Sequence, residues 1–282
     1  MHATKKWLLM VAGAALAAPV AAATDKGSVE LTYVEWSSEV ASTNVIKTVL
    51  EQQGYEVKMT SVSASAMWQG VGSGDADGMV AAWLPSTHGH YLERMQDDVV
   101  DLGPNLEGTK IGLVVPAYVD VDSIADLNAN AEKFDEEIIG IDPGAGIMSK
   151  TETAMEEYGM EDMELVSGSG ATMTAALKDA INNQEAVVVT GWTPHWKFAR
   201  FDLKYLDDPK KVYGGAEQIH TIVREGLEEE MPEVYRILDA FQWSPADMQQ
   251  VMIWNREDDA EPAETAARWV EENPEKVNAW LD

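Results

Sequence analysis

The sequence contains no cysteine in 282 residues. This absence excludes disulfide bonds, thiolate nucleophiles and a lipid-modified cysteine as a membrane anchor. Basic residues are also scarce, because 20 Lys and Arg stand against 49 Asp and Glu and the formal net charge is −29. A chain this acidic is repelled by phosphate backbones, so nucleic acid is excluded as a partner. The acid excess serves solubility or indicates a salt-rich habitat.

The N-terminal apolar run is too short to cross a membrane, since a membrane-spanning helix needs about 20 apolar residues. This stretch, 7–18, is rich in Ala and Gly. It follows the basic segment 1–6 and precedes the small residues 21–23. This order predicts a signal peptide over 1–23, cleaved before Thr24, and hence export to the periplasm. A membrane anchor is the alternative.

One pattern occurs twice in the remaining chain: a short apolar strand, a Trp at its carboxyl end, and a Pro two residues later. The first copy runs into Trp83 and the second into Trp192. Another strand-to-helix junction lies 47 residues upstream of each, at Trp36 and at Ala145. We interpret the repetition as two similar lobes whose strand ends face one cleft, with Trp at three of the four corresponding positions.

Strands and helices alternate along the chain, as in an α/β protein with a parallel or mixed sheet. Apolar periodicity and turn residues predict strands over 29–34, 55–61, 78–83, 110–115, 138–141, 164–167, 186–190 and 219–223. They predict helices over 38–53, 65–72, 90–95, 124–134, 147–158, 173–182, 232–242, 245–255 and 262–273. The expected domains are one lobe over 24–116 plus 217–282 and a second over 117–216. We expect two parallel or mixed sheets with flanking helices, joined by a two-stranded hinge.

Five segments resemble the glycine betaine-binding proteins of osmoprotectant ABC importers, the ProX/OpuAC-like family. They are residues 33–36, 83–88, 140–148, 191–196 and 205–209. The resemblance covers essentially all of the chain after the leader. It implies a periplasmic substrate-binding protein with a type II-like, two-lobed α/β fold, in which the lobes close over the ligand.

The resemblance also implies the site residues. In the family, three indoles surround the trimethylammonium group of the ligand, while two backbone amides at a helix start and one His hold its carboxylate. Matched by position, the indoles are those of Trp36, Trp83 and Trp192. The His is His88, and the amides are those of Gly146 and Ile147.

The chemistry of these residue types agrees with that assignment. A quaternary ammonium has no N–H to donate, so aromatic faces suit it better than a carboxylate does. A carboxylate needs fixed donors, and the Gly-rich turn at 142–147 offers free amides at a helix start. We therefore expect glycine betaine as ligand, ahead of proline betaine, dimethylsulfoniopropionate and choline. The expected partners are an ABC permease with its ATPase, and the expected oligomeric state is a monomer.

Other classes of function are less well supported. His88 and His90 suggest a metal site, but no third ligand is suitably spaced for zinc, so we expect no metal and no cofactor. Ser169 lacks the strand-to-helix G-x-S-x-G turn of a hydrolase, so we expect no enzyme. A periplasmic hydrolase and an aromatic-platform sugar binder remain the alternatives. For His88, capping of the local helix stays open.

The other Trp residues of the exported chain are expected to pack rather than bind. Trp196 is expected to brace Trp192. The remaining residues of this set are Trp68, Trp243, Trp254, Trp269 and Trp280, the last four expected on helices.

Overall fold

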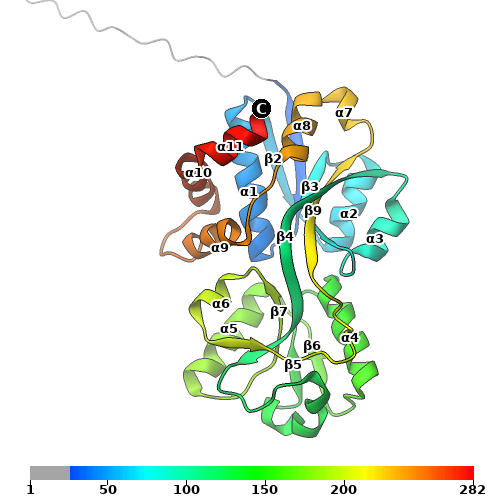
Figure 1. Ribbon diagram of the computed structural model, residues 1–282, viewed down its shortest axis with the longest axis vertical. Helices are drawn as coiled ribbons and strands as arrows, with labels where there is room; N and C mark the ends of the chain where they lie inside the picture. Colours follow the sequence, from blue (N-terminus) through cyan, green and yellow to red (C-terminus); the bar gives the residue numbers. More distant parts are fainter. Residues whose placement is uncertain (1–25) are drawn as a thin grey trace, which may run out of the picture.

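The structure is a computed structural model that describes residues 26–282, so the predicted signal peptide over 1–23 lies outside the described residues. The chain forms two lobes along the long axis, joined by β4 (Val99–Pro116) and by the segment that leads into β9 (Glu217–Arg224) (Figure 1). The predicted two-lobed α/β fold is confirmed. Over the described residues, no helix combines the length and apolar character needed to cross a bilayer.

The first lobe is built on strands in the order β2-β1-β3-β9-β4. Strand β1 (Ser28–Tyr33) is parallel to β2 (Glu56–Ser61) and to β3 (Gly78–Leu84), and β9 is antiparallel to β3. Every residue of β3 is buried. Such a strand has a continuous apolar sequence instead of an alternating one because both of its faces are covered.

Helices flank this sheet on two sides. In Figure 1, α1 and α9 to α11 lie to the left of the strands, and α2 and α3 lie to the right. Helix α1 contacts β1, β2 and β3, whereas α2 contacts β1, β3 and β9. The helices of this lobe are α1 (Ser37–Gln52), α2 (Ala64–Ser73), α3 (Gly89–Met95), α7 (Leu227–Glu230), α8 (Pro232–Ala240), α9 (Pro245–Trp254), α10 (Pro262–Glu272) and α11 (Pro274–Leu281).

The second lobe continues the same path of strands in the order β4-β7-β5-β6, with β8 also paired to β4. Its strands are β5 (Glu137–Ile139), β6 (Glu164–Val166), β7 (Val189–Thr193) and β8 (Leu203–Tyr205). Its helices are α4 (Gly146–Tyr158), α5 (Gly170–Asn183) and α6 (Trp196–Arg200), preceded by the 3-10 helices η1 (Ile124–Asp126) and η2 (Asn128–Phe134).

Strand β4 connects the lobes. Its residues 99–109 pair with β9, and its residues 110–114 pair with β7. The two sheets expected from the sequence are therefore joined through β4 into one nine-stranded sheet, eight strands of which follow one path while β8 pairs with β4 beside it. The lobe limits 24–116 plus 217–282 and 117–216 stay a prediction, and these pairings favour moving the first crossing from 116 to 109–110.

Several predicted elements differ from the structure. The strand predicted over 110–115 begins at Val99. Its first half was missed because Gly103 and Gly108 are typical of turns in a sequence. In the structure, both have positive φ and the strand accommodates them through bulges, seen as shifts in its register with β9. The helix predicted over 124–134 is two 3-10 segments, with Asn130 at non-helical dihedrals and its side chain bonded to the carbonyl of Asp126. No residue range was predicted for α11, although Trp280 was correctly expected on a helix, and the short elements α6, α7 and β8 were not predicted.

The C-terminal helices are packed by a cluster of aromatic rings. The ring of Trp269 stacks on Trp280 at 5.9 Å and meets the edge of Trp243 at 5.6 Å. Trp280 also contacts Phe241 and donates its indole N–H to the carbonyl of Gln242 at 3.0 Å. These Trp residues are buried, as expected of packing residues. Trp243 was wrongly expected on a helix and lies in the connection between α8 and α9.

We expect Trp269→Ala to lower the free energy of unfolding by about 3–5 kcal/mol, because it leaves a cavity beside the rings of Trp243 and Trp280. Urea denaturation measures the change. Ile253→Ala is the control, since Ile253 is 37% exposed and its loss should cost less than about 1 kcal/mol. Equal midpoints for the two variants would contradict the role of the cluster.

Candidate binding site between the lobes

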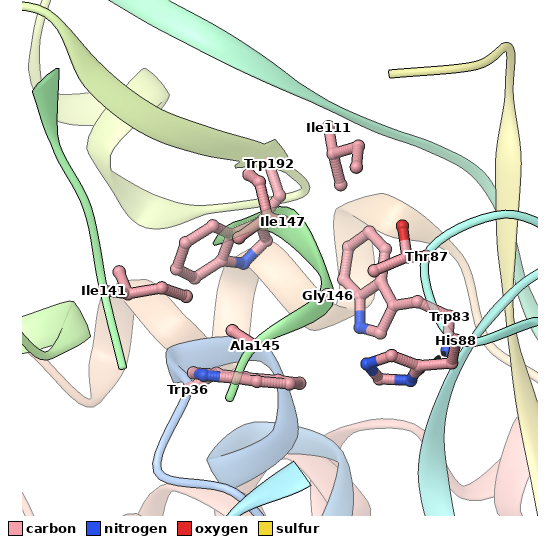
Figure 2. A pocket seen from close by; sticks show the side chains of 10 residues that line it. All are labelled: Trp36, Trp83, Thr87, His88, Ile111, Ile141, Ala145, Gly146, Ile147 and Trp192. Carbon is pink, nitrogen blue, oxygen red and sulfur yellow. Dashed lines mark hydrogen bonds between the residues drawn. The ribbon is translucent and has the colours of Figure 1, made fainter. Parts of the chain in front are cut away.

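All six site residues predicted from the sequence line one cavity: Trp36, Trp83, His88, Gly146, Ile147 and Trp192. The cavity has a volume of about 300 Å³, including the open space at its mouth. Trp36, Trp83 and His88 come from the first lobe, and the other three come from the second (Figure 2). The lining is therefore complete only when the two lobes are together. That these residues bind a ligand stays a prediction.

The three indoles enter the cavity from strand ends and a helix start. Trp36 is the residue before α1, Trp83 is the next-to-last residue of β3, and Trp192 is the next-to-last residue of β7. Each is almost fully buried, at 6%, 3% and 5% exposure respectively. Figure 2 shows the three rings around the cavity.

Every one of these indole N–H groups already has an acceptor in the protein. Trp36 Nε1 donates to Asp142 Oδ1 at 2.9 Å, and Trp83 Nε1 donates to Glu39 Oε1 at 2.7 Å. Trp192 Nε1 donates to Ser38 Oγ at 3.2 Å. The polar edges are thereby occupied, which leaves the apolar ring faces for a ligand. The first and third of these bonds run between lobes.

His88 is positioned as a neutral hydrogen-bond donor. Its side chain is fully buried, and its Nδ1 accepts the backbone N–H of Trp83 at 3.1 Å. The proton of the neutral ring must then be on Nε2, which is buried without a partner among the described residues. Burial, with a smaller effect of His90, lowers the pKa of His88 to about 3. The predicted alternative of helix capping is not supported, because the His88 side chain makes no cap hydrogen bond to α3.

The start of α4 supplies further donors. Within residues 26–282, the amides of Gly146 and Ile147 make no hydrogen bond, as is usual for the first turn of a helix. A Cβ on Gly146 would lie 2.5 Å from both Cγ2 and the carbonyl oxygen of Thr87 in the first lobe. Only Gly therefore permits this approach of the two lobes, and the free amides belong to two residues that line the cavity.

The lining residues carry no side chain that is charged at neutral pH. An ion of net charge would enter this cavity without a counter-ion in its lining, which is unfavourable. A zwitterion would instead place its cation against ring faces and its anion against N–H donors. No group of three or more His, Cys, Asp or Glu residues that could hold a metal ion occurs in the described part of the chain.

Sequence reasoning missed two sets of residues. Four further residues line the cavity: Thr87, Ile111, Ile141 and Ala145. Of these, only Ala145 could have been predicted from the sequence, because it lies 47 residues before Trp192, just as Trp36 lies 47 residues before Trp83. The second set, Ser38, Glu39 and Asp142, accepts the indole protons from outside the cavity, and no local pattern identifies acceptors so distant in the sequence.

Trp68 and Trp196 lie close to the site but do not line the cavity. Trp68 stacks on Tyr91, and both rings pack against His88. Trp196 donates to Ser37 Oγ at 3.2 Å, and His195 contacts both Trp196 and Trp192. Trp196 therefore supports Trp192 indirectly, through His195.

Comparison with known families gives a match over nearly all of the described chain. A family model described as the substrate-binding domain of an ABC-type glycine betaine transport system matches residues 27–272. GbuC of Listeria monocytogenes, named a glycine betaine/carnitine transport binding protein, is 49% identical over 153 residues. That match covers 54% of this chain and 51% of GbuC, so the chain spans about half the length of this curated relative.

Solved structures give two further similarities. Lactococcal OpuAC, in its closed-liganded conformation complexed with glycine betaine, has a TM-score of 0.87 and 44% identity, covering 91% of this chain and 100% of that chain. An ABC-transporter choline binding protein, in complex with choline, has a TM-score of 0.85 and 28% identity, covering 90% and 91%. The ligands in these two structures share a trimethylammonium group.

We expect the His88 ring to stay neutral, with its proton on Nε2, between about pH 5 and pH 9 because its pKa is near 3. Imidazole ¹⁵N chemical shifts measure both the charge and the tautomer. The unfolded ring gains a proton as the pH falls through its ordinary value of 6.5, while the folded ring does not. His88 therefore destabilises the fold increasingly below that pH. A His88 titration near 6.5 in the folded protein would show that the ring is not buried in this form.

Proposed function

The chain belongs to the family of substrate-binding domains of ABC-type glycine betaine transport systems, and on that basis we propose that it captures glycine betaine for an importer. The observation that carries the proposal is the pairing of three indole faces with a set of unpartnered N–H donors around one cavity without charge in its lining. Glycine betaine carries a methylated cation at one end and a carboxylate at the other, and this lining matches both.

The cation end of the ligand is assigned to Trp36, Trp83 and Trp192. A desolvated cation over an indole face gains about 2 kcal/mol, and the same faces bury the methyl groups. The acceptors bonded to the indole edges include the carboxylates of Glu39 and Asp142, which add negative charge just outside the rings. This arrangement attracts a cation without contacting it directly.

The carboxylate end is assigned to His88, Gly146 and Ile147. The Nε2–H of His88 and the two amides at the start of α4 are donors without partners in the described residues. Hydrogen bonds to a charged acceptor are worth about 1.5–3 kcal/mol each. Because these donors come from both lobes, a bound carboxylate would hold the lobes together.

The same proposal covers partners and location. Closure of the two lobes over the ligand would give an ABC permease and its ATPase a distinct shape to recognise. Export by the signal peptide predicted over 1–23 would put the protein in the periplasm, where it acts as a binding protein and not as an enzyme.

Choline is the second candidate, because this chain is similar to a choline binding protein solved with choline. Choline shares the cation with glycine betaine but has a hydroxyl in place of the carboxylate. It would therefore enter this cavity with a net charge and leave the α4 amides without an anion. The lining favours the zwitterion.

We predict that glycine betaine binds, that choline binds at least about tenfold more weakly, and that glycine does not bind measurably. Choline lacks the carboxylate that would accept hydrogen bonds from His88 and the start of α4. Glycine would have to bury an ammonium group, whose N–H donors find no acceptor at the indole faces. Calorimetry with the exported chain measures all three ligands. Choline binding as tightly as glycine betaine would refute the carboxylate assignment, and glycine binding would refute the cage.

Replacing Trp36, Trp83 or Trp192 singly by Ala should weaken glycine betaine binding by about 1–3 kcal/mol. Trp254→Ala is the matched control, since Trp254 is buried on α9 under the guanidinium of Arg268, outside the cavity. That variant should lose stability and keep its affinity. Wild-type affinity in all three cage variants would rule out this site.

A further inference from the structure

Glu39 is a buried carboxylate that does not line the cavity. It lies in the first turn of α1 with no exposed surface. Its Oε1 accepts the indole proton of Trp83 at 2.7 Å, and its Oε2 accepts the hydroxyl proton of Ser38. The oxygen of Ser38 in turn accepts the indole proton of Trp192 at 3.2 Å. One carboxylate is thus connected to a Trp of each lobe.

We infer that Glu39 is a positioning residue of the Trp cage, holding Trp83 directly and Trp192 through Ser38, so that the cage closes only when this chain of hydrogen bonds forms. The inference rests on the proposed function, because a cage needs a cation to enclose. The inference goes beyond the proposed function by assigning a role to Glu39 and Ser38, which do not line the cavity.

The direction of the hydrogen bonds supports this role. An indole N–H can only donate, so both Trp residues need an acceptor. The hydroxyl of Ser38 has one proton, which it donates to Glu39, and this leaves its lone pairs for Trp192. Both oxygens of Glu39 act as acceptors, which is the pattern of an ionised carboxylate. A protonated Glu39 would turn one oxygen into a donor and reverse one bond.

The charge of Glu39 connects the same chain to the ligand. Burial, with a smaller effect of the negative charge of Asp142, raises its pKa to about 7 against the hydrogen bonds from Ser38 and Trp83. A bound cation favours the ionised form, so affinity should increase as the pH rises through about 7. Glycine betaine itself does not titrate in that range.

The other ionisable groups near the cage in the described chain also bear on binding near pH 7, and burial lowers the pKa of His90, on α3 next to His88, below its ordinary value of 6.5. The pKa of His88 is about 3 and that of His195 is well below its ordinary value, so neither ring titrates there. Lys197 does, since burial lowers its pKa to about 7, and its Nζ lies 4.6 Å from the Trp192 ring centre. Its protonation would repel a cation, which also weakens binding at low pH. Lys197→Met removes that contribution.

The test measures glycine betaine affinity by calorimetry from about pH 5.5 to about pH 8.5 in the Lys197→Met background. In the Lys197→Met variant alone, the affinity for glycine betaine should rise with pH. Adding Glu39→Gln should lower affinity at high pH by about tenfold to a hundredfold and abolish the rise, since Gln keeps the shape and one acceptor but has no charge. Equal affinities with and without the Glu39→Gln substitution at every pH would overturn the inference.

A second measurement tests the Ser38 branch and does not depend on how well the Glu39 variant folds. Ser38→Ala should weaken binding by about tenfold in the wild type but have a much smaller effect in a Trp192→Phe background, because Phe has no N–H to hold and only the hydrogen bond to Glu39 is then lost. Independent, additive effects of the two substitutions would overturn the branch. Failure of the wild type itself to bind glycine betaine would instead refute the proposed function.

Discussion

The site depends on the need to satisfy the single polar group of each indole. A Trp side chain is large and apolar except for its N–H, and burial of that N–H without an acceptor costs free energy. Asp142, Glu39 and Ser38 supply the acceptors for the three cavity indoles. These bonds fix the ring edges toward protein and leave the faces toward the cavity. The same bonds fix the separation of the lobes, because two of the three cross between them.

The donors at the other end of the cavity follow the opposite rule. The indoles are fully partnered, whereas His88 Nε2 and the amides of Gly146 and Ile147 have no partner in the described chain. Unpartnered buried donors are unfavourable unless a ligand completes them. In the proposed assignment, one end of the cavity therefore suits a cation without N–H groups and the other end suits an anion. That asymmetry, with no charge in the lining, is the reason why we propose a zwitterion as the ligand.

Trp serves three different purposes in this chain, which explains why composition alone could not identify the site. Trp269 and Trp280 stack in the core of the C-terminal helices, while Trp68 packs on Tyr91 behind His88. Trp36, Trp83 and Trp192 face the cavity. Burial does not separate these groups, since all of these indoles are almost fully buried. What separates them is position, because the cavity residues lie where strands end and helices begin.

The sequence determined the features that depend on local spacing. An apolar strand followed by a Trp and a Pro turn placed Trp83 and Trp192, and a Gly-rich turn placed the free amides of Gly146 and Ile147, because strand ends and helix starts are set by neighbouring residues. Most helices and strands were predicted for the same reason, and the exceptions, such as the bulged half of β4, break the simple periodicity.

Only the tertiary structure decided which groups hold the indoles. The acceptors of Trp36, Trp83 and Trp192 lie 106, 44 and 154 residues away in sequence. Side-chain periodicity carries no information over such separations. Packing within the first lobe brings Glu39 to Trp83, and the crossing of β4 between the lobes brings the other two pairs together.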